Sequence, residues 1–358
     1  MRPRRRGVTV LALVVVAVSL WFAFRDVSML AVGQLLAAAG PQLLWVPLPF
    51  VLGQLLDTRA VGLLFQRMGA APPFLRRLGA QAAGEATTLA LPMGFLVGES
   101  LRPWLLAAGD QARLASSIAA VSGRKALLIM GEGAWILLAL LLAPAAAFEL
   151  SRQLLGGPWL IALSVLLGTV LIGVGVSMVC FLGGGHVASQ LFARLASAVP
   201  LRFAARVERS ESYFTRTDAQ LAQVFAAPRR QLLVPALSYL SVWLLEGLEV
   251  WLILHLLHVE VPLTTVFYIE AMVASCRSLL PLTPAGLGVQ DAGYVACFTA
   301  LGIPGALGVG AAFCLAKRTR EFGWCLFGTA CWLLARRSNQ RAARARLAPT
   351  SLRSSPAA

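Results

Sequence analysis

The stretch WLIALSVLLGTVLIGVGVSMVCFL, residues 159–182, contains no charged side chain. About 20 consecutive apolar residues are enough for a helix to cross the ~30 Å hydrocarbon core of a bilayer. Two further runs, 41–65 and 232–254, are equally long and contain only a few charges. These runs predict helices that span a membrane.

The composition agrees with this prediction. Of the 358 residues, 58% are hydrophobic and 13% are charged, whereas a soluble domain has roughly 45–50% apolar and about 25% charged residues. The net charge is +15, which in a soluble protein would suggest nucleic acid. Here the basic residues cluster between the apolar runs, as in cytoplasmic loops of membrane proteins. We therefore predict an all-α polytopic membrane protein whose partners are membrane lipids and not nucleic acid.

The N-terminal apolar run, 8–24, follows the basic residues RPRRR at 2–6. A signal peptide is one interpretation, but the run is long and lacks a small-residue cleavage site. We favour an uncleaved first span with a cytoplasmic N-terminus.

Other segments complete the predicted topology. Besides the three runs above, spans are expected at 126–148 and 306–335. Residues 78–97 have basic residues on both sides and are interrupted by glycine and proline, which predicts a broken hairpin entering from the cytoplasm. Residues 263–280 and 286–301 form either two spans or a second broken hairpin. Both alternatives, six spans with two hairpins or eight spans with one, place both termini in the cytoplasm.

The domain organisation follows from these segments. Residues 1–335 are expected to form a single transmembrane domain. Within it, the arginine-rich segment 194–230 is predicted to be a cytoplasmic amphipathic helix on the membrane surface. Residues 336–358 are basic and rich in Ala, Ser and Pro, and are predicted to be a disordered cytoplasmic tail.

Two segments resemble each other. PMGFLVGE at 92–99 and PAGLGVQD at 284–291 both fit Pro-x-Gly-x-x-Val-x-acid, and a pair of basic residues follows each acid at a similar distance. Proline and glycine break helices, and such breaks at membrane depth are tolerated only where protein or a cavity satisfies the backbone. Paired breaks in two halves are typical of transporters with an inverted repeat. The alternative is chance similarity between two segments rich in glycine and proline.

Four charges lie near the middle of the span 306–335: Lys317, Arg318, Arg320 and Glu321. The apolar stretches before and after them are too short to cross alone, so the charges should lie within the membrane or at a break in the helix. Lys317 and Glu321 are four residues apart and are predicted to pair. The remaining bases need Asp291, Glu270 or an anionic ligand. A structural network is one interpretation, and a cavity for a lipid headgroup, which these bases would face, is the other.

The stretch SLLPLTPAGLGVQDAG, residues 278–293, resembles the P-x-x-P-G-G-L-G-x-x-E-G signature of the lysylphosphatidylglycerol synthase transmembrane region, or flippase-like domain family. Upstream, Leu91-Pro92 and the run GESLR at 98–102 resemble the family's first motif. The segments around 270–277, 288–291 and 315–321 are most similar to the hopanoid-biosynthesis-associated branch. Ala285 and Asp291 depart from the signature, where the family usually has glycine and glutamate.

The resemblance, over about 40–335, implies a lipid-related role in the bacterial inner membrane. Lysylphosphatidylglycerol synthesis needs a further soluble domain, and only a basic tail follows residue 335, so this activity is expected to be absent. The candidate lipid site consists of the following residues: Glu99, Arg102, Arg124, Lys125, Glu270, Arg277, Pro284, Gly286, Gly288, Gln290, Asp291, Lys317, Arg318, Arg320 and Glu321. Arg124 and Lys125 are equally well explained as snorkelling residues.

No known catalytic motif is present in the sequence, and the histidines and cysteines lack metal-ligand spacing. We therefore expect no enzyme activity, cofactor or metal. The favoured function is a flippase-like protein that moves a hopanoid, phospholipid or polyprenyl-linked lipid. The alternatives are a membrane scaffold for lipid-biosynthesis enzymes and, third, an intramembrane enzyme acting on lipid-linked sugar.

Overall fold

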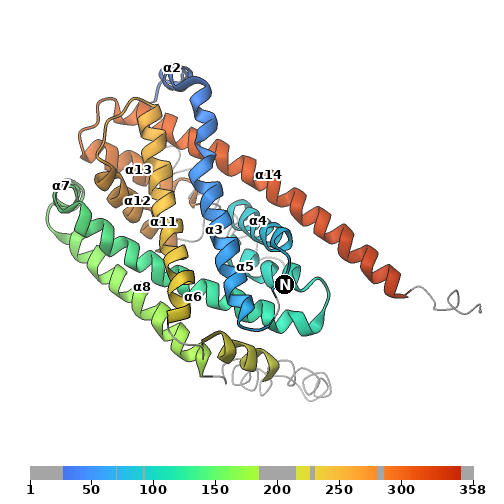
Figure 1. Ribbon diagram of the computed structural model, residues 1–358. Coiled ribbons are helices and arrows are strands. Elements are labelled where there is room, and N and C mark those ends of the chain that lie inside the picture. The colour runs from blue at the N-terminus through green and yellow to red at the C-terminus, as the bar shows by residue number, and fades with distance from the viewer. Residues whose placement is uncertain are drawn as a thin grey trace, which may run out of the picture.

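The computed structural model describes residues 27–69, 71–91, 93–184, 215–225, 230–279 and 286–347. Within these ranges every regular element is a helix, as Figure 1 shows. The all-α prediction is confirmed. The predicted span 8–24 and most of the predicted surface segment 194–230 lie outside the described residues, although residues 215–225 are helical.

Four described stretches are long and apolar enough to cross a membrane: Met29–Gln66, Arg113–Leu142, Trp159–Gly183 and Gln231–Leu256. The first contains helix α2 (Met29–Ala39), the 3₁₀ helix η1 (Gly40–Trp45) and α3 (Pro47–Gln66). The other three belong to α6 (Gln111–Leu142), α8 (Trp159–Gly183) and α11 (Arg230–Leu256). Each of the predicted runs 41–65, 159–182 and 232–254 lies within one of these stretches.

Helix α6 differs from the span predicted at 126–148. It begins at Gln111, so that Arg124 and Lys125 lie inside the helix, and it ends at Leu142. Proline disfavours the α conformation of the preceding residue, and Ala143 accordingly has φ −134° and ψ 54°. A separate helix, α7 (Pro144–Leu155), begins at the proline.

The segment around 92 is a broken hairpin of α4 (Phe74–Ala90) and α5 (Gly94–Ala107). Met93, between the two arms, has the left-handed φ of 53°, which reverses the chain. The arms contain 17 and 14 residues, so neither reaches the ~20 residues of a spanning helix. The structure therefore has the predicted hairpin, with arms that extend further on both sides.

The second hairpin consists of α12 (Leu263–Leu279) and α13 (Val289–Ala300). Because α13 has 12 residues, it is only about 18 Å long at 1.5 Å per residue. This length favours the hairpin over two separate spans. The long helix α14 (Ala306–Leu347) then runs without a break, so the four charges near the middle of the predicted span 306–335 lie within continuous helix. Residues 336–347, expected to be disordered, belong to this helix.

The two halves repeat one pattern in opposite directions. Each has a long helix, a broken hairpin and a second long helix: α3, α4–α5 and α6, then α11, α12–α13 and α14. In Figure 1, α3 runs downward from α2 beside the upward-running α11, and α6 and α14 also run in opposite senses. The first arm of each hairpin packs against the other half, with α4 against α14 and α12 against α6. This arrangement is an inverted repeat whose halves interlock.

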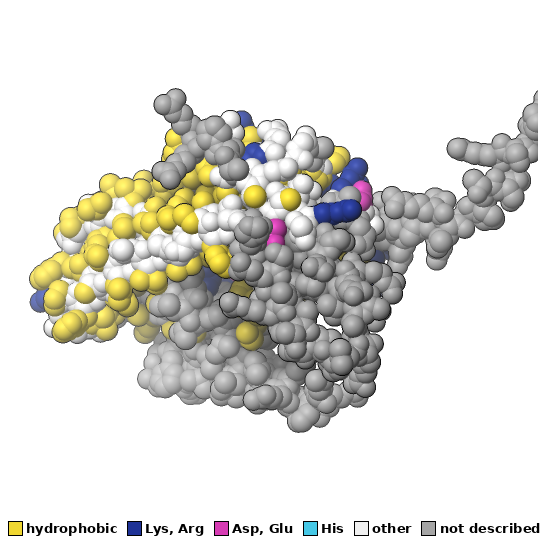
Figure 2. All heavy atoms as spheres, turned by 90° about the horizontal axis from the view of Figure 1, so that it is seen from below, with side chains coloured by type: hydrophobic (Ala, Val, Ile, Leu, Met, Phe, Trp, Pro, Cys, Tyr) yellow, Lys and Arg dark blue, Asp and Glu magenta, His cyan; other side chains and the backbone are white. Residues whose placement is uncertain are grey.

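The outer surface is suited to a hydrocarbon environment. Figure 2 shows hydrophobic side chains covering the side of the molecule on which α7 and α8 lie. Helix α8 contributes the following exposed apolar residues: Trp159, Leu163, Val165, Leu166, Val170, Val174, Val176 and Phe181. An exposed apolar surface of this extent is typical of contact with a membrane or another protein.

Close packing between the halves predicts a large difference between two glycines of α14. A β-carbon at Gly328 would lie 2.6 Å from the β-carbon of Ala86 and would also collide with the carbonyl of Ala82 on α4, whereas one at Gly323 would meet nothing within 4 Å. We expect Gly328→Ala to destabilise the protein by about 1–3 kcal/mol through overpacking. Gly323→Ala should change stability by no more than about 1 kcal/mol, in the stabilising direction. Thermal melting of both variants in detergent measures the difference, and equal melting would contradict the tight α4–α14 contact.

Candidate functional site

The first cluster of buried charges surrounds Arg124 on α6. Its guanidinium donates to both carboxylate oxygens of Asp57 on α3, at 2.6–3.0 Å, and to Glu99 on α5, at 3.1 Å. Gln81 of α4 donates a further hydrogen bond of 2.6 Å to Asp57. Arg124 and Asp57 are only 3% and 2% exposed. The cluster therefore joins four helices of the first half.

Arg102 on α5 connects the two arms of the first hairpin. Its guanidinium lies 2.8 Å from Glu99 on its own helix and 2.9 Å from Glu85 on α4. The Nε atom of Arg102 and the second carboxylate oxygen of Glu99 are buried without a hydrogen-bond partner. Both atoms have hydrogen-bonding capacity that the described residues do not use. Lys125 is half-buried on α6 and is not among the groups bonded to Asp57 or Glu99.

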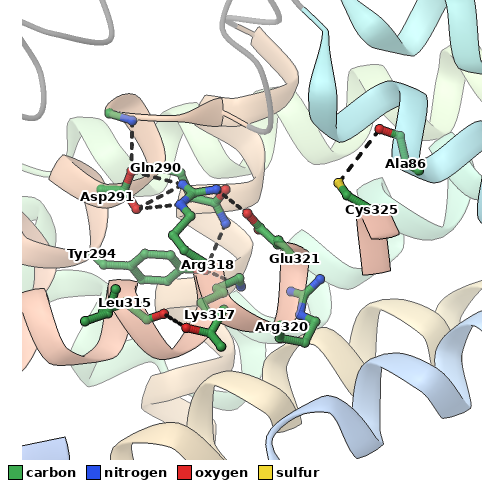
Figure 3. A network of polar contacts seen from close by, with 12 residues as sticks. Ala86, Gln290, Asp291, Tyr294, Leu315, Lys317, Arg318, Arg320, Glu321 and Cys325 are labelled. Carbon is green, nitrogen blue, oxygen red and sulfur yellow. Dashed lines mark hydrogen bonds and ion pairs between the residues drawn. The ribbon is translucent and has the colours of Figure 1, made fainter. Parts of the chain in front are cut away.

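The second cluster begins with Arg318 on α14, shown in Figure 3 between Asp291 and Glu321. Arg318 donates to both oxygens of Asp291 on α13, at 2.9–3.2 Å, and to Glu321 one turn along its own helix. Asp291 also accepts a hydrogen bond of 2.9 Å from the backbone N–H of Gly288. The acid thus caps the start of α13 and ties that helix to α14.

The hydroxyl of Tyr294 on α13 is the centre of a neighbouring group. It donates a hydrogen bond to Oε2 of Glu270 on α12 and accepts hydrogen bonds from Lys317, at 2.8 Å, and Gln290, at 3.3 Å. The ammonium of Lys317 lies 3.6 Å from Oε2 of Glu270. These four side chains are all at least 95% buried.

Two further ion pairs attach α11 to its neighbours. Arg320 of α14 forms a two-pronged contact with Glu249 of α11, with N–O distances of 2.8 and 3.0 Å. The Arg320 guanidinium also lies 3.9 Å from the ring centre of Phe50 on α3. Arg277 of α12 donates to Glu246 of α11 at 3.2 Å. Helix α11 is therefore joined to both the second hairpin and α14.

The two clusters have corresponding parts. In the first half, Arg124 alone meets both the acid of the hairpin's second arm and the acid of the long helix before the hairpin. In the second half, Arg318 meets the acid of the second arm, and Arg320 meets the acid of the preceding long helix. The predicted repeat of a broken helix, an acid and a base on the next helix is present in both halves.

The predicted pairs have mixed outcomes. Of the partners considered for the remaining bases, Asp291 is the one that pairs with Arg318. The predicted pairing of Lys317 with Glu321 is wrong, because Glu321 bonds to Arg318 and Lys317 turns towards Glu270. The reason is that Lys317 faces α12 and α13, and Arg318 lies three residues before Glu321 on the same helical face.

The glycines of the second motif allow backbone conformations that other residues rarely adopt. Gly286 and Gly288 have φ values of 66° and 82°, which residues with a β-carbon rarely adopt. A β-carbon at Gly286 would lie 3.2 Å from the side chain of Arg277. Pro284 lies outside the described residues.

The candidate list from the sequence omitted six residues that the structure places in the site: Asp57, Gln81, Glu85, Glu246, Glu249 and Tyr294. Asp57 and Glu85 interrupt apolar segments, and an acid within a span is itself a signal of function or pairing. Tyr294 offered no such signal, because a tyrosine in an apolar helix is ordinary.

A pocket of about 450 Å³ lies between α2, η1 and α3 on one side and α14 on the other. Its walls are almost entirely apolar and include Phe50 and Trp324, whose rings meet edge to face. Of the three bases predicted to face a cavity, only Arg320 lines this pocket. The pocket has the dimensions and polarity for part of a lipid tail.

The described residues include no group of three or more His, Cys, Asp or Glu side chains that could hold a metal ion.

Comparison with families of known proteins gives a match over most of the chain. The family model of the lysylphosphatidylglycerol synthase TM region matches residues 9–316. No curated protein and no solved structure matches the chain. The match begins earlier than the resemblance found in the sequence and ends just before the charged segment of α14. Because the matched residues make up most of the chain, this protein belongs to the lysylphosphatidylglycerol synthase TM region family of membrane proteins.

Proposed function

We propose that the protein moves a lipid between the two leaflets of the bacterial inner membrane without changing its covalent structure. The substrate classes are hopanoids, phospholipids and polyprenyl-linked lipids. The observation that supports this function best is the pair of oppositely directed broken hairpins, each with an acid held by a base on the next long helix. Broken helices inside a bundle are tolerated where they line a cavity, and paired breaks of this kind are typical of transporter binding sites.

Two features supply places for the two ends of a lipid. The apolar pocket between α3 and α14 is suited to a hydrocarbon portion. The buried Nε of Arg102, which has no partner, can donate to a phosphate or hydroxyl of a headgroup. A headgroup that bonds to Arg102 competes with Glu85 and Glu99, and such competition would loosen the hairpin and let it move.

Lipid movement in proteoliposomes tests this proposal. We expect the wild-type protein to accelerate exchange of fluorescent phospholipid between leaflets relative to protein-free vesicles. Arg102→Gln should slow this exchange about 10–100-fold, because a charged hydrogen bond contributes about 1.5–3 kcal/mol. The variant should fold, since Glu99 keeps Arg124 and Glu85 is 22% exposed.

Arg152→Gln is the matched control. Arg152 also pairs with a glutamate, Glu149, but this pair is exposed on α7. The rate of lipid exchange with Arg152→Gln should equal the rate with wild type. Rates for wild type no higher than in protein-free vesicles, across phospholipid and hopanoid probes, would exclude lipid movement.

The second candidate is a membrane scaffold for a lipid-modifying enzyme. It is favoured by the ion pairs of α12 and α14, since Arg277, Lys317, Arg318 and Arg320 all contact acids. A scaffold would show no lipid movement in vesicles and would co-purify with one lipid-biosynthesis enzyme after crosslinking in cells. Movement by the purified protein alone excludes a purely structural role.

The proposal includes an orientation. The positive-inside rule places the N-terminus, residues 194–230 and the segment after residue 336 in the cytoplasm. Activity reporters fused after Arg6, Arg216 and Arg346 should all give the cytoplasmic signal. One periplasmic signal among the three would overturn the orientation.

A further inference from the structure

The hydroxyl of Tyr294 uses its full hydrogen-bonding capacity. A phenolic hydroxyl has one donor and two acceptor positions. It donates to Glu270 and accepts from Lys317 and Gln290. The three partners come from α12, α14 and α13, so one oxygen atom joins both arms of the second hairpin to the long helix.

Two oxygens of this group have no partner. Oε1 of Glu270 and the amide oxygen of Gln290 are buried without a hydrogen bond. Both residues bond to the Tyr294 hydroxyl through their other polar atom, and they are 0% and 1% exposed. An ionised carboxylate can only accept hydrogen bonds. An ionised Glu270 therefore supplies no donor for its own Oε1 or for the amide oxygen of Gln290. A protonated Glu270 would carry the missing donor.

The ion-paired acids of α11–α14 outnumber the ion-paired bases. Among the described residues, five acids in these helices form ion pairs: Glu246, Glu249, Glu270, Asp291 and Glu321. Four bases pair with them: Arg277, Lys317, Arg318 and Arg320. One negative charge is therefore in excess, and an unmatched buried charge is costly. Protonation of one acid removes the excess.

Glu270 is the acid best placed to take this proton. Its pair with Lys317 has an N–O distance of 3.6 Å, whereas the other four acids lie within 3.2 Å of a guanidinium. The other four acids pair with guanidinium groups, which remain charged. Glu270 instead pairs with a lysine, and the hydroxyl of Tyr294 bonds to both side chains.

The surrounding helices contribute further charged groups. Helix α6, which packs against α12, contributes Glu132, which is 6% exposed. Helix α7 also packs against α12, and its Glu149 is bound to Arg152 at the surface. Glu132 is a further acid, and the ion pair of Glu270 is formed with α14, so neither helix removes the excess of acid.

We propose that Glu270 is a proton-binding site and that its protonation is coupled to lipid movement. The carboxylate takes up one proton to become a neutral acid, and Lys317 then keeps only its hydrogen bond to Tyr294. Release of the proton restores the ion pair and draws α12 towards α14. The coupling rests on the proposed lipid movement, but the proton site itself does not.

Infrared spectroscopy of the full chain in detergent tests the site without any transport assay. A protonated carboxyl has a carbonyl stretch that is separate from the bands of ionised carboxylates. We expect one such band to persist at neutral pH and to be lost in Glu270→Gln. Hydrogen bonds from Arg152 lower the pKa of Glu149, so Glu149→Gln should leave the band unchanged.

Tyr294→Phe is the second variant, in case Glu270→Gln does not fold. It keeps the acid but removes its hydrogen-bond donor, so the band should shift in frequency. If the band is missing in wild type at every pH at which the protein is folded, the site is overturned. A band that is the same in Glu270→Gln or Tyr294→Phe as in wild type also overturns it.

Lipid exchange in proteoliposomes at several pH values tests the coupling. The wild-type rate should depend on pH, and Glu270→Gln should lose this dependence. An unchanged dependence in Glu270→Gln overturns the coupling. If neither protein moves lipid while the infrared band behaves as expected, the proposed function fails and the proton site stands.

Discussion

Arg124→Met should destabilise the protein by about 3–5 kcal/mol, because it leaves the buried carboxylate of Asp57 without a counterion. The change removes every guanidinium contact of Asp57, and Glu99 keeps only Arg102. Asp57 is 2% exposed, so water cannot replace the lost partner. Thermal melting in a mild detergent should show a large drop or a failure to purify folded protein.

Arg113→Met is the matched control for this experiment. Arg113 is an arginine of the same helix, paired with Asp110, but the two side chains are 60% and 39% exposed. Exposed pairs contribute about 0–1 kcal/mol, so this variant should melt close to wild type. Adding Asp57→Asn to Arg124→Met removes the stranded charge and should recover part of the loss. Equal melting of Arg124→Met and Arg113→Met would mean that Asp57 is neutral in the folded protein.

The second large effect is expected at Arg320. From the sequence, Arg320 is predicted to face a cavity and to serve function more than stability, so that Arg320→Ala folds but loses lipid movement. In the structure, Arg320 pairs with Glu249, which is fully buried and accepts hydrogen bonds from two nitrogens of the guanidinium. We therefore expect Arg320→Ala to lose about 3–5 kcal/mol of stability before any loss of function can be measured.

A double variant separates stability from function at this position. Replacing a buried ion pair with apolar residues of similar volume is often neutral or stabilising, so Arg320→Met with Glu249→Leu should melt close to wild type. If Arg320 binds a headgroup beside the apolar pocket, the double variant should still fail to move lipid. A double variant that is stable and fully active assigns the pair a structural role only. Arg336→Met, farther along the same helix and next to Trp332, is the control.

The spans that the sequence predicted best are those with a continuous local signal. Helix α8 is apolar over its whole length, and its predicted and observed ends differ by one residue. The end of α6 was less predictable, because Leu141 and Leu142 are as apolar before Pro144 as the residues after it. There the backbone restriction of proline, and not hydrophobicity, determines where the helix stops.

The charged site could be predicted only in part. The rule of pairs four residues apart concerns one helix, but Asp57 and Arg124 are 67 residues apart, and Glu249 and Arg320 are 71 apart. The shared motif around Glu99 and Asp291 nevertheless indicated which acids would meet the bases of the next helix. The motif could indicate these acids because it occurs once in each half of the chain.

The interlocking of the halves has a consequence for synthesis of the chain. Helix α4 ends at Ala90, but α14, against which it packs, begins at Ala306. At a translation speed of about 5–20 residues per second, the ribosome needs roughly 10–40 s to make the residues in between. During this interval the first hairpin has entered the membrane without its final neighbour. Its charged side chains find their partners within α3–α6, but the surface of α4 at Ala82 and Ala86 stays uncovered until Gly328 of the last long helix arrives.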